Sequence, residues 1–213
     1  DKLENGVNLA LVSDAGTPGI SDPGYELIKK AVERDIEIIP IPGPNAALLA
    51  LISSGLPMHS FVFEGFIPRK GEERITALKD IQKEKRTVII YESPYRVKNT
   101  IEDLASYLDQ RKIALVRELS KVHEEKIYGT APEISQKISD REIKGEIVLV
   151  IEGRTSEDEE EGWEELSIVE HVKLLMENGY RKKKAIKKVA KLRELPKSDV
   201  YEKAVVIDAR DYM

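Results

Sequence analysis

A loop rich in glycine, proline, serine and aspartate is the segment best suited to bind a ligand. It runs from Ser13 to Gly24 and follows the apolar run Val7–Val12. Gly16 and Gly19 allow the backbone to approach a ligand closely, and loops of this kind lie where open α/β sheets bind their ligands. The loop has two aspartates and no Lys or Arg, and it lacks the spacing of a P-loop or a dinucleotide fingerprint. It therefore favours a ligand with a cationic or polar part over a triphosphate, with an ordinary strand-to-helix turn as the alternative.

A second loop of the same kind follows the next apolar run, Ile36–Ile41. Pro42, Gly43, Pro44 and Asn45 lead into a segment of small residues that begins at Ala46. Small residues admit a flat ligand close to the backbone, and the start of a helix offers free N–H donors. Two such loops on successive strands predict one shared crevice.

The elements that position these loops alternate between apolar β-type runs and helical-period segments. We expect strands at Val7–Val12, Ile36–Ile41, Phe61–Phe66, Thr87–Tyr91, Ile113–Arg117, Lys126–Gly129 and Glu146–Ile151. We expect helices at Pro23–Arg34, Pro44–Ser54, Glu72–Lys83, Tyr95–Asp109 and Pro132–Ile138. This alternation predicts an α/β fold with largely parallel pairing and a mixed sheet near its end.

Changes in charge and in the pattern of expected strands and helices divide the chain into four predicted parts. Residues 1–56 form the remainder of an N-terminal α/β subdomain, and residues 57–153 form a second α/β subdomain with a crevice between the two. Residues 154–165 hold seven acidic residues and one arginine, which predicts a solvated linker. Residues 166–213 hold twelve Lys or Arg and seven acidic residues, and their apolar spacing predicts a small all-α domain of helix-turn-helix type.

Composition excludes several classes of protein. With 41% hydrophobic residues among 213, the chain can bury a core, and its net charge of −5 excludes a uniformly basic coat. It has no cysteine, which fits a reducing, cytoplasmic location, and its three histidines lie far apart, which argues against a metal site. The longest apolar run, Ala46–Ile52, is too short to span a membrane.

Five motifs, in order along the chain, resemble those of the tetrapyrrole-methylase-like S-adenosylmethionine enzymes. They are Ser13–Gly24, Pro40–Pro44, Phe63–Lys70, Tyr91–Arg96 and Arg117–Glu125. The last three resemble, more narrowly, the branch of that family that methylates small-subunit ribosomal RNA. The family begins with a further strand and a Gly-Asn-Leu-type loop that this sequence lacks, and residue 1 is Asp. We therefore expect an N-terminally truncated chain, with a processed N-terminus as the alternative.

The resemblance implies S-adenosylmethionine as the cofactor and a set of residues that bind it. These are Asp14, Ala15, Gly16, Thr17, Gly19, Ile20, Ser21, Asp22, Gly43, Pro44, Asn45, Ala46 and Tyr91. It implies 2′-O-methylation of a cytidine in 16S ribosomal RNA, within the RNA or the small ribosomal subunit, and a homodimer. It implies no membrane partner.

Methyl transfer to a ribose hydroxyl needs alignment and a route for the proton. The predicted catalytic residues are Glu118, Lys121 and His123, which cluster after the strand that ends at Arg117. Glu124 is a further candidate, and a surface salt-bridge network is the plainer interpretation. Because the absent N-terminal segment is acidic in the family, it is another place for the base.

RNA phosphates call for positive charge, and the chain offers two groups of cations. Arg69 and Lys70 lie in a predicted loop, and Arg96 lies at a helix start, where it needs a phosphate or carboxylate partner. The tail supplies Arg181, Lys182, Lys183, Lys184, Lys187 and Lys188. Loop solubility and a solvated helix face are the alternatives.

Two other functions stay open from the sequence. One is a C-methyltransferase for a tetrapyrrole precursor, against which the basic tail argues. The other is a non-catalytic RNA-binding fragment.

Overall fold

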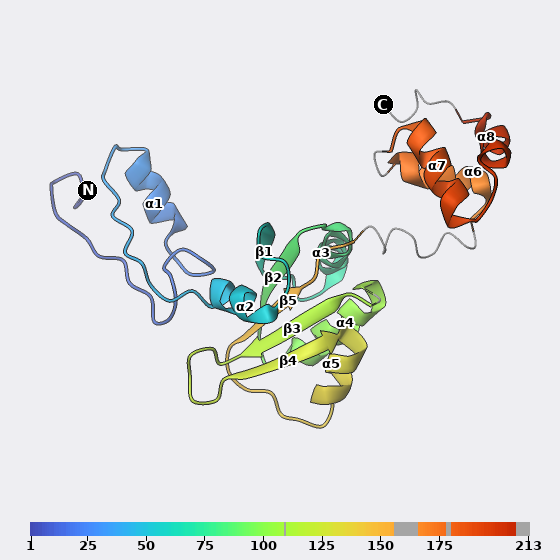
Figure 1. Cartoon of the computed structure of the whole chain (residues 1–213). Coiled ribbons are helices and arrows are strands. Elements are labelled where there is room, and N and C mark those ends of the chain that lie inside the picture. The colour runs from blue at the N-terminus through green and yellow to red at the C-terminus, as the bar shows by residue number, and fades with distance from the viewer. Residues whose placement is uncertain (109, 156–165, 178–179, 208–213) are drawn as a thin grey trace. The chain divides into compact units, whose positions relative to one another are not determined.

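The computed structural model describes residues 1–108, 110–155, 166–177 and 180–207, and Figure 1 shows the chain in colours that run from N- to C-terminus. The chain divides into two compact units, Asp1–Arg154 and Thr155–Met213. Most of the predicted acidic linker, residues 156–165, lies outside the described part.

The first unit is built on a mixed sheet with the strand order β1-β2-β5-β3-β4. Its strands are β1 (Phe61–Phe66), β2 (Thr87–Glu92), β3 (Lys112–Arg117), β4 (Glu125–Thr130) and β5 (Ile147–Ile151). Only β1 and β2 pair in parallel, whereas β2–β5, β5–β3 and β3–β4 are antiparallel. The prediction of largely parallel pairing was wrong, because the last strand returns between β2 and β3 in the opposite direction.

Alternate residues of the central strands face two different cores. On one face, residues such as Ile90, Leu115 and Leu149 pack beneath α3 (Gly71–Lys83), α4 (Val97–Leu108) and α5 (Ala131–Ile138). On the other face, Ile89 and Val148 pack against α2 (Ala46–Ser54). Because both faces are covered, β5 is buried along its whole length, which explains its unbroken apolar sequence.

Two predicted strands are not formed. Residues 7–12 and 36–41 have no strand assignment and pair with no strand of the described chain. A single extended segment has no partner for its backbone N–H and C=O groups, so an apolar run alone does not make a strand. The side chains stay exposed, at 82% for Val12 and 78% for Ile41. The helix α1 (Tyr25–Val32) stands between these two segments in the chain.

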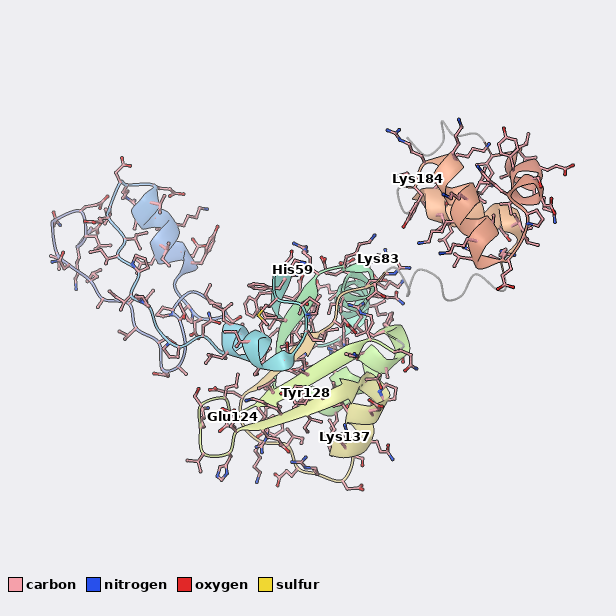
Figure 2. The ribbon with its side chains drawn as sticks, in the orientation of Figure 1. His59, Lys83, Glu124, Tyr128, Lys137 and Lys184 are labelled. Carbon is pink, nitrogen blue, oxygen red and sulfur yellow. The ribbon has the colours of Figure 1, made fainter. Side chains whose placement is uncertain are left out.

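Polar contacts attach α2 and α5 to the sheet. The Tyr128 hydroxyl, on β4, donates to the Ser53 carbonyl of α2 at 2.8 Å. The Lys137 ammonium, on α5, donates to the Tyr128 carbonyl at 2.7 Å, and Figure 2 labels both side chains. A side-chain hydrogen bond from β4 and the packing of Ala47, Ala50 and Leu51 thus hold α2 against the sheet.

The second unit is a bundle of α6 (Ile168–Glu177), α7 (Lys182–Leu192) and α8 (Lys197–Ala204), as its sequence predicted. Its core includes Val172, Leu175, Ile186, Val189 and Val200. Lysines cover the side of α7 that faces away from this core. Among the described residues, no helix is both long and apolar enough to cross a bilayer.

Candidate cofactor and catalytic site

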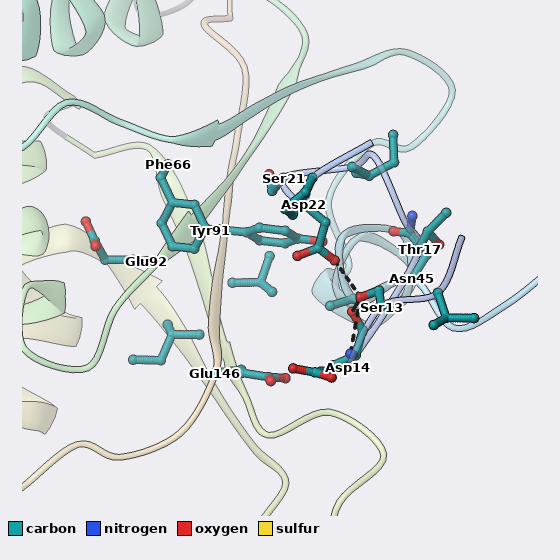
Figure 3. A pocket seen from close by; sticks show the side chains of 18 of the residues that line it. Ser13, Asp14, Thr17, Ser21, Asp22, Asn45, Phe66, Tyr91, Glu92 and Glu146 are labelled. Atoms are coloured by element: carbon teal, nitrogen blue, oxygen red, sulfur yellow. Dashed lines mark hydrogen bonds between the residues drawn. The ribbon is translucent and has the colours of Figure 1, made fainter. Parts of the chain in front are cut away.

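A cavity of about 520 Å³ lies in the first unit where the two predicted loops meet the sheet (Figure 3). A volume of this size suits a ligand of nucleoside dimensions. The loops contribute one wall, with Leu11 to Thr17, Ile20 to Pro23, Asn45 and Ala46. The sheet contributes the other wall, with Phe66, Tyr91, Glu92, Glu146, Ile147 and Val148.

The two loops adjoin, as the sequence predicted. The Thr17 hydroxyl donates to the Pro44 carbonyl at 3.1 Å and so joins the first loop to the second. Asn45 begins α2 as its N-cap, and its Oδ1 accepts a hydrogen bond from the Leu48 N–H at 3.1 Å. Since Ala46 also lines the cavity, the first turn of α2 forms part of its wall.

Ser13 organises the first loop. Its Oγ lies 2.7 Å from Asp22 Oδ2 and 2.6 Å from the Ala15 carbonyl, and it accepts from the Ala15 N–H at 3.3 Å. The hydroxyl has one proton, so it donates to one of these two acceptors at a time. The contacts draw the two ends of the loop together, and the second oxygen of Asp22 has no partner among the described residues and can accept from a ligand.

Aromatic side chains form the sheet-side wall. Tyr91 packs edge-to-face with Phe63 at 4.9 Å and with Phe66 at 5.7 Å between ring centroids. Burial raises the pKa of the Tyr91 hydroxyl, so this side chain is neutral at physiological pH. The pairing shifts between Phe63 and Gly65, and a Cβ on Gly65 would lie 3.2 Å from Ser21 Oγ. Glycine at this irregular position, with φ of +64°, therefore lets the first loop approach β1.

Glu92 lines the cavity, but its carboxylate is already bonded to other groups of the protein. Its carboxylate accepts from the Thr100 hydroxyl at 2.6 Å and from the Ser93 N–H at 2.7 Å, and it pairs with Arg96 Nε at 3.4 Å. Arg74 extends this network, because its Nη2 donates to Thr100 Oγ1 at 3.0 Å. The partner that the sequence required for Arg96 is thus a carboxylate of the chain itself.

The cavity is electrostatically negative. Asp14, Asp22, Glu92 and Glu146 line it, and no Lys or Arg is among its described lining residues. In Figure 3 the carboxyl groups of Asp14 and Glu146 point toward one another from the two walls. The arrangement suits a cationic ligand with several hydroxyl or amine donors.

Most of the predicted cofactor residues meet at this cavity. Its lining includes Asp14, Ala15, Gly16, Thr17, Ile20, Ser21, Asp22, Asn45, Ala46 and Tyr91. Gly19, Gly43 and Pro44 do not line it, although the Pro44 carbonyl holds Thr17. The sequence predicted that the segment of Phe66 closes the other side of the crevice, but it missed Glu92 and Glu146 as lining residues. Glu92 lies inside the Tyr91–Arg96 motif and could have been added, whereas Glu146 carries no local signal.

Among the predicted catalytic residues, Glu118 and Lys121 lie beside the cavity, and none of the three belongs to its lining. Lys121 Nζ is 3.0 Å from Glu118 Oε1 and 3.0 Å from Glu146 Oε2. His123 is an exposed residue of the loop between β3 and β4. Glu118 and Lys121 therefore contact the cavity through Glu146, whereas no hydrogen bond or ion pair of the described residues joins His123 to them.

The predicted RNA-binding residues differ in how free they are to bind phosphate. Arg69 and Lys70 lie just before α3, and Lys70 is exposed. In the second unit, Lys182 donates to the Ile207 carbonyl at 2.7 Å, and Lys188 lies 4.9 Å from the centre of the Tyr180 ring. Exposed cations on and around α7 are Arg181, Lys183, Lys184, Lys187 and Lys191.

Comparison with known proteins gives the class to which this fold and cavity belong. The family model of the Tetrapyrrole (Corrin/Porphyrin) Methylases matches residues 1–135. Among solved structures, the methyltransferase CobJ superposes with a TM-score of 0.54 at 18% identity, over 71% of this chain and 67% of that one. This likeness supports the predicted α/β fold class.

Curated relatives place the chain more narrowly. Proteins named ribosomal RNA small subunit methyltransferase I are 48% identical in Halalkalibacterium halodurans and 44% identical in Bacillus subtilis, over 94% of this chain and 70% of each relative. The protein of that name from Synechocystis is 43% identical over 98% of this chain and 75% of its own length. The chain belongs to the ribosomal RNA small subunit methyltransferase I family, a branch of the tetrapyrrole methylases.

Proposed function

We propose that this chain transfers a methyl group from S-adenosylmethionine to the ribose 2′-hydroxyl of a cytidine in small-subunit ribosomal RNA. The observation that carries the proposal is the acidic, aromatic-walled cavity at the two adjoining loops, in a chain of this family. When bound, the cofactor supplies an electrophilic methyl group on a sulfonium centre.

The residues of the cavity fit this cofactor. Its ammonium and ribose hydroxyls are donors, which Asp14, Asp22 and the loop carbonyls can accept. Its sulfonium is a cation, for which the Tyr91 and Phe66 rings offer favourable electrostatics. The described lining contains no Lys or Arg, so it does not repel the sulfonium cation as a phosphate-binding loop would.

Two groups of cations are proposed to hold the RNA. Arg69 and Lys70 follow β1, whose last residue, Phe66, lines the cavity, so they lie close in sequence to the place of reaction. The exposed lysines of α7 would bind the phosphate backbone and steer the substrate. Arg96, Lys182 and Lys188 already contact protein groups and would add less.

Catalytic roles for Glu118, Lys121 and His123 stay predictions. So do the homodimer and the cytoplasmic location, which the family resemblance and the composition suggest. Sedimentation equilibrium would test the dimer, with twice 24.1 kDa as the expected mass.

The function is tested with labelled S-adenosylmethionine and small ribosomal subunits that lack the modification. We expect label on one cytidine and, because 2′-O-methylation removes the nucleophile of alkaline cleavage, resistance of the following phosphodiester to alkali. Asp22→Asn should weaken binding of S-adenosylhomocysteine and lower transfer. Binding of RNA with no binding of S-adenosylhomocysteine would instead support a non-catalytic RNA-binding fragment, and transfer to a tetrapyrrole precursor alone would overturn the choice of substrate.

A further inference from the structure

Glu146 is a cavity-lining carboxylate to which the proposed cofactor contacts assign no role. It immediately precedes β5, on the wall opposite the first loop. Its side chain is 63% exposed, so a proton that it receives can pass to water. Oε2 pairs with Lys121 Nζ at 3.0 Å, and Oε1 has no partner among the described residues.

The other three carboxylates of the cavity are less suited to receive a proton from a substrate. Glu92 is buried and accepts from Thr100 and Ser93, so its oxygens are engaged. Asp22 is held by Ser13, and Asp14 belongs to the same loop, which the cofactor is proposed to occupy. Glu146 alone lies on the sheet-side wall with a free oxygen and a path to solvent.

Lys121 is suited to hold this carboxylate and not to act as a base. Glu146 and Glu118 both pair with its ammonium, and their hydrogen bonds and charges raise the pKa of Lys121. The lysine therefore stays protonated and has no lone pair to accept a proton. Its two contacts fix where the Glu146 carboxylate points.

Glu118 secures the arrangement from the other side. The Glu146 N–H donates to Glu118 Oε1 at 2.8 Å, and the Glu118 N–H donates to the Glu146 carbonyl at 3.0 Å. Glu118 adopts φ of +52°, a strained value for a residue with a side chain. This reciprocal pairing joins the start of β5 to the loop after β3.

We infer that Glu146 accepts the proton of the attacking 2′-hydroxyl and that Lys121 is a positioning residue for its carboxylate. This rests on the proposed function. The O–H bond breaks toward Glu146 Oε1 while an O–C bond forms to the donated methyl group. The electrons of the broken C–S bond stay on sulfur, which becomes a neutral thioether, and the proton then leaves Glu146 for water.

The central test is the single-turnover rate of methyl transfer with saturating cofactor and RNA. Glu146→Gln keeps the shape of the side chain but loses the basic oxygen. We expect a rate lowered by about 100-fold or more, with the affinity for S-adenosylhomocysteine changed by less than about threefold. Glu142→Gln is the matched control, because Glu142 is exposed, pairs with Lys144 and does not line the cavity. It should keep the parent rate.

A second pair of variants tests the role of Lys121. Lys121→Met should lower the rate by about tenfold, and Lys121→Arg should restore most of it, because an arginine can hold two carboxylates. Affinity for S-adenosylhomocysteine and the thermal midpoint should be alike in the two variants. A merely structural role would make rate and thermal midpoint fall together.

The outcomes distinguish a failure of this inference from a failure of the proposed function. No transfer by the parent chain overturns both. Transfer by the parent chain with a Glu146→Gln rate within threefold overturns the inference alone. Equal losses of rate and of S-adenosylhomocysteine affinity would make Glu146 a cofactor ligand and also overturn it.

Discussion

Arg74 and Arg96 donate to the same backbone oxygen, the carbonyl of Pro68. Arg74 Nη1 lies 3.0 Å from it and Arg96 Nη2 lies 3.3 Å from it, and Arg96 also donates to the Ile67 carbonyl at 2.9 Å. Glu92 and Asp103 balance the two guanidinium charges. The base of the segment that carries Arg69 and Lys70 is thereby fixed next to Phe66.

Replacing Arg74 should loosen this attachment. Arg74→Met removes the donor to Thr100 Oγ1 and the ion pair with Asp103, and it leaves the Pro68 carbonyl with Arg96 as its donor. We expect a loss of about 2–3 kcal/mol in the free energy of unfolding. Chemical denaturation measures it. Arg86→Met is the control, because Arg86 pairs with Glu84 at the surface and should cost less than about 1 kcal/mol. Equal losses in both variants would contradict the assignment.

The contact between the two loops should contribute to cofactor affinity. Thr17→Val removes the hydrogen bond to the Pro44 carbonyl while keeping the side-chain shape. We expect the dissociation constant of S-adenosylhomocysteine to rise by about 3- to 10-fold, equivalent to about 0.5–1.5 kcal/mol, in a calorimetric titration. Thr76→Val, at an exposed position on α3, should leave it unchanged. An unchanged constant in Thr17→Val would show that the loops hold their places without this bond.

Gly145 is confined by Glu118. A Cβ at this position would lie 2.4 Å from the Glu118 carboxyl carbon, and φ is +88°. Gly145→Ala should therefore destabilise the chain by about 1–3 kcal/mol in thermal or chemical unfolding. In the background Glu118→Ala, which lacks the clashing atoms, the same substitution should cost less. A cost that is equal in both backgrounds would assign the whole effect to the backbone angle.

The lysines of α7 should set the salt dependence of RNA binding. Replacing Lys183, Lys184, Lys187 and Lys191 by Gln should lower the slope of log affinity against log salt by about 3. The control changes Lys2, Lys29, Lys30 and Lys79, which are exposed in the first unit, and so alters net charge equally. An equal fall in the control would show a general charge effect and no binding face.

His171 should make the stability of the second unit depend on pH. It is fully buried on α6, Arg193 Nε donates to its Nδ1 at 3.2 Å, and burial lowers its pKa to about 4. Unfolded histidine titrates near about 6.5, so between these values the unfolded state binds more protons and stability falls as pH falls. From pH 7.5 to 5.5 the loss due to His171 should be about 1–1.5 kcal/mol.

The control for this prediction is His171→Leu, measured by denaturation at the two pH values. The variant should lose the part of the pH dependence that His171 contributes, while the carboxylates of the chain still titrate. A pH dependence identical to that of the parent would mean that His171 is protonated equally in both states.

Local sequence was sufficient to predict those elements whose structure depends mainly on their own residues. The apolar run of β5 predicted a strand, which the structure covers on both faces, and the polar, glycine-rich loop of Asp14 and Asp22 predicted the acidic wall. Residues 7–12 are also mostly apolar, yet a strand requires a partner as well, which no local pattern supplies.

Glu146 shows a second limit of local patterns. Antiparallel pairing of β2 with β5 sets Glu92 opposite Ile147, and this register brings Glu146 to the cavity beside Tyr91 and Glu92. The two residues are far apart in sequence, and parallel pairing would have carried Glu146 to the other end of the sheet. The convergence of Arg74 and Arg96 on Pro68 likewise depends on the packing of α3 against α4.

The attachment of α2 through Ser53 and Tyr128 holds one part of the loop-side wall of the cavity more firmly than the other. Ala46 lies on α2, which is attached to the same sheet that contains Tyr91, so these two residues keep a constant spacing. The segment from Ser13 to Asp22 is joined to the rest of the described first unit chiefly by the hydrogen bond of Thr17 to the Pro44 carbonyl, so it is held less firmly than α2. Engineering toward bulkier methyl-donor analogues should therefore begin on this segment, which lies outside the packed core.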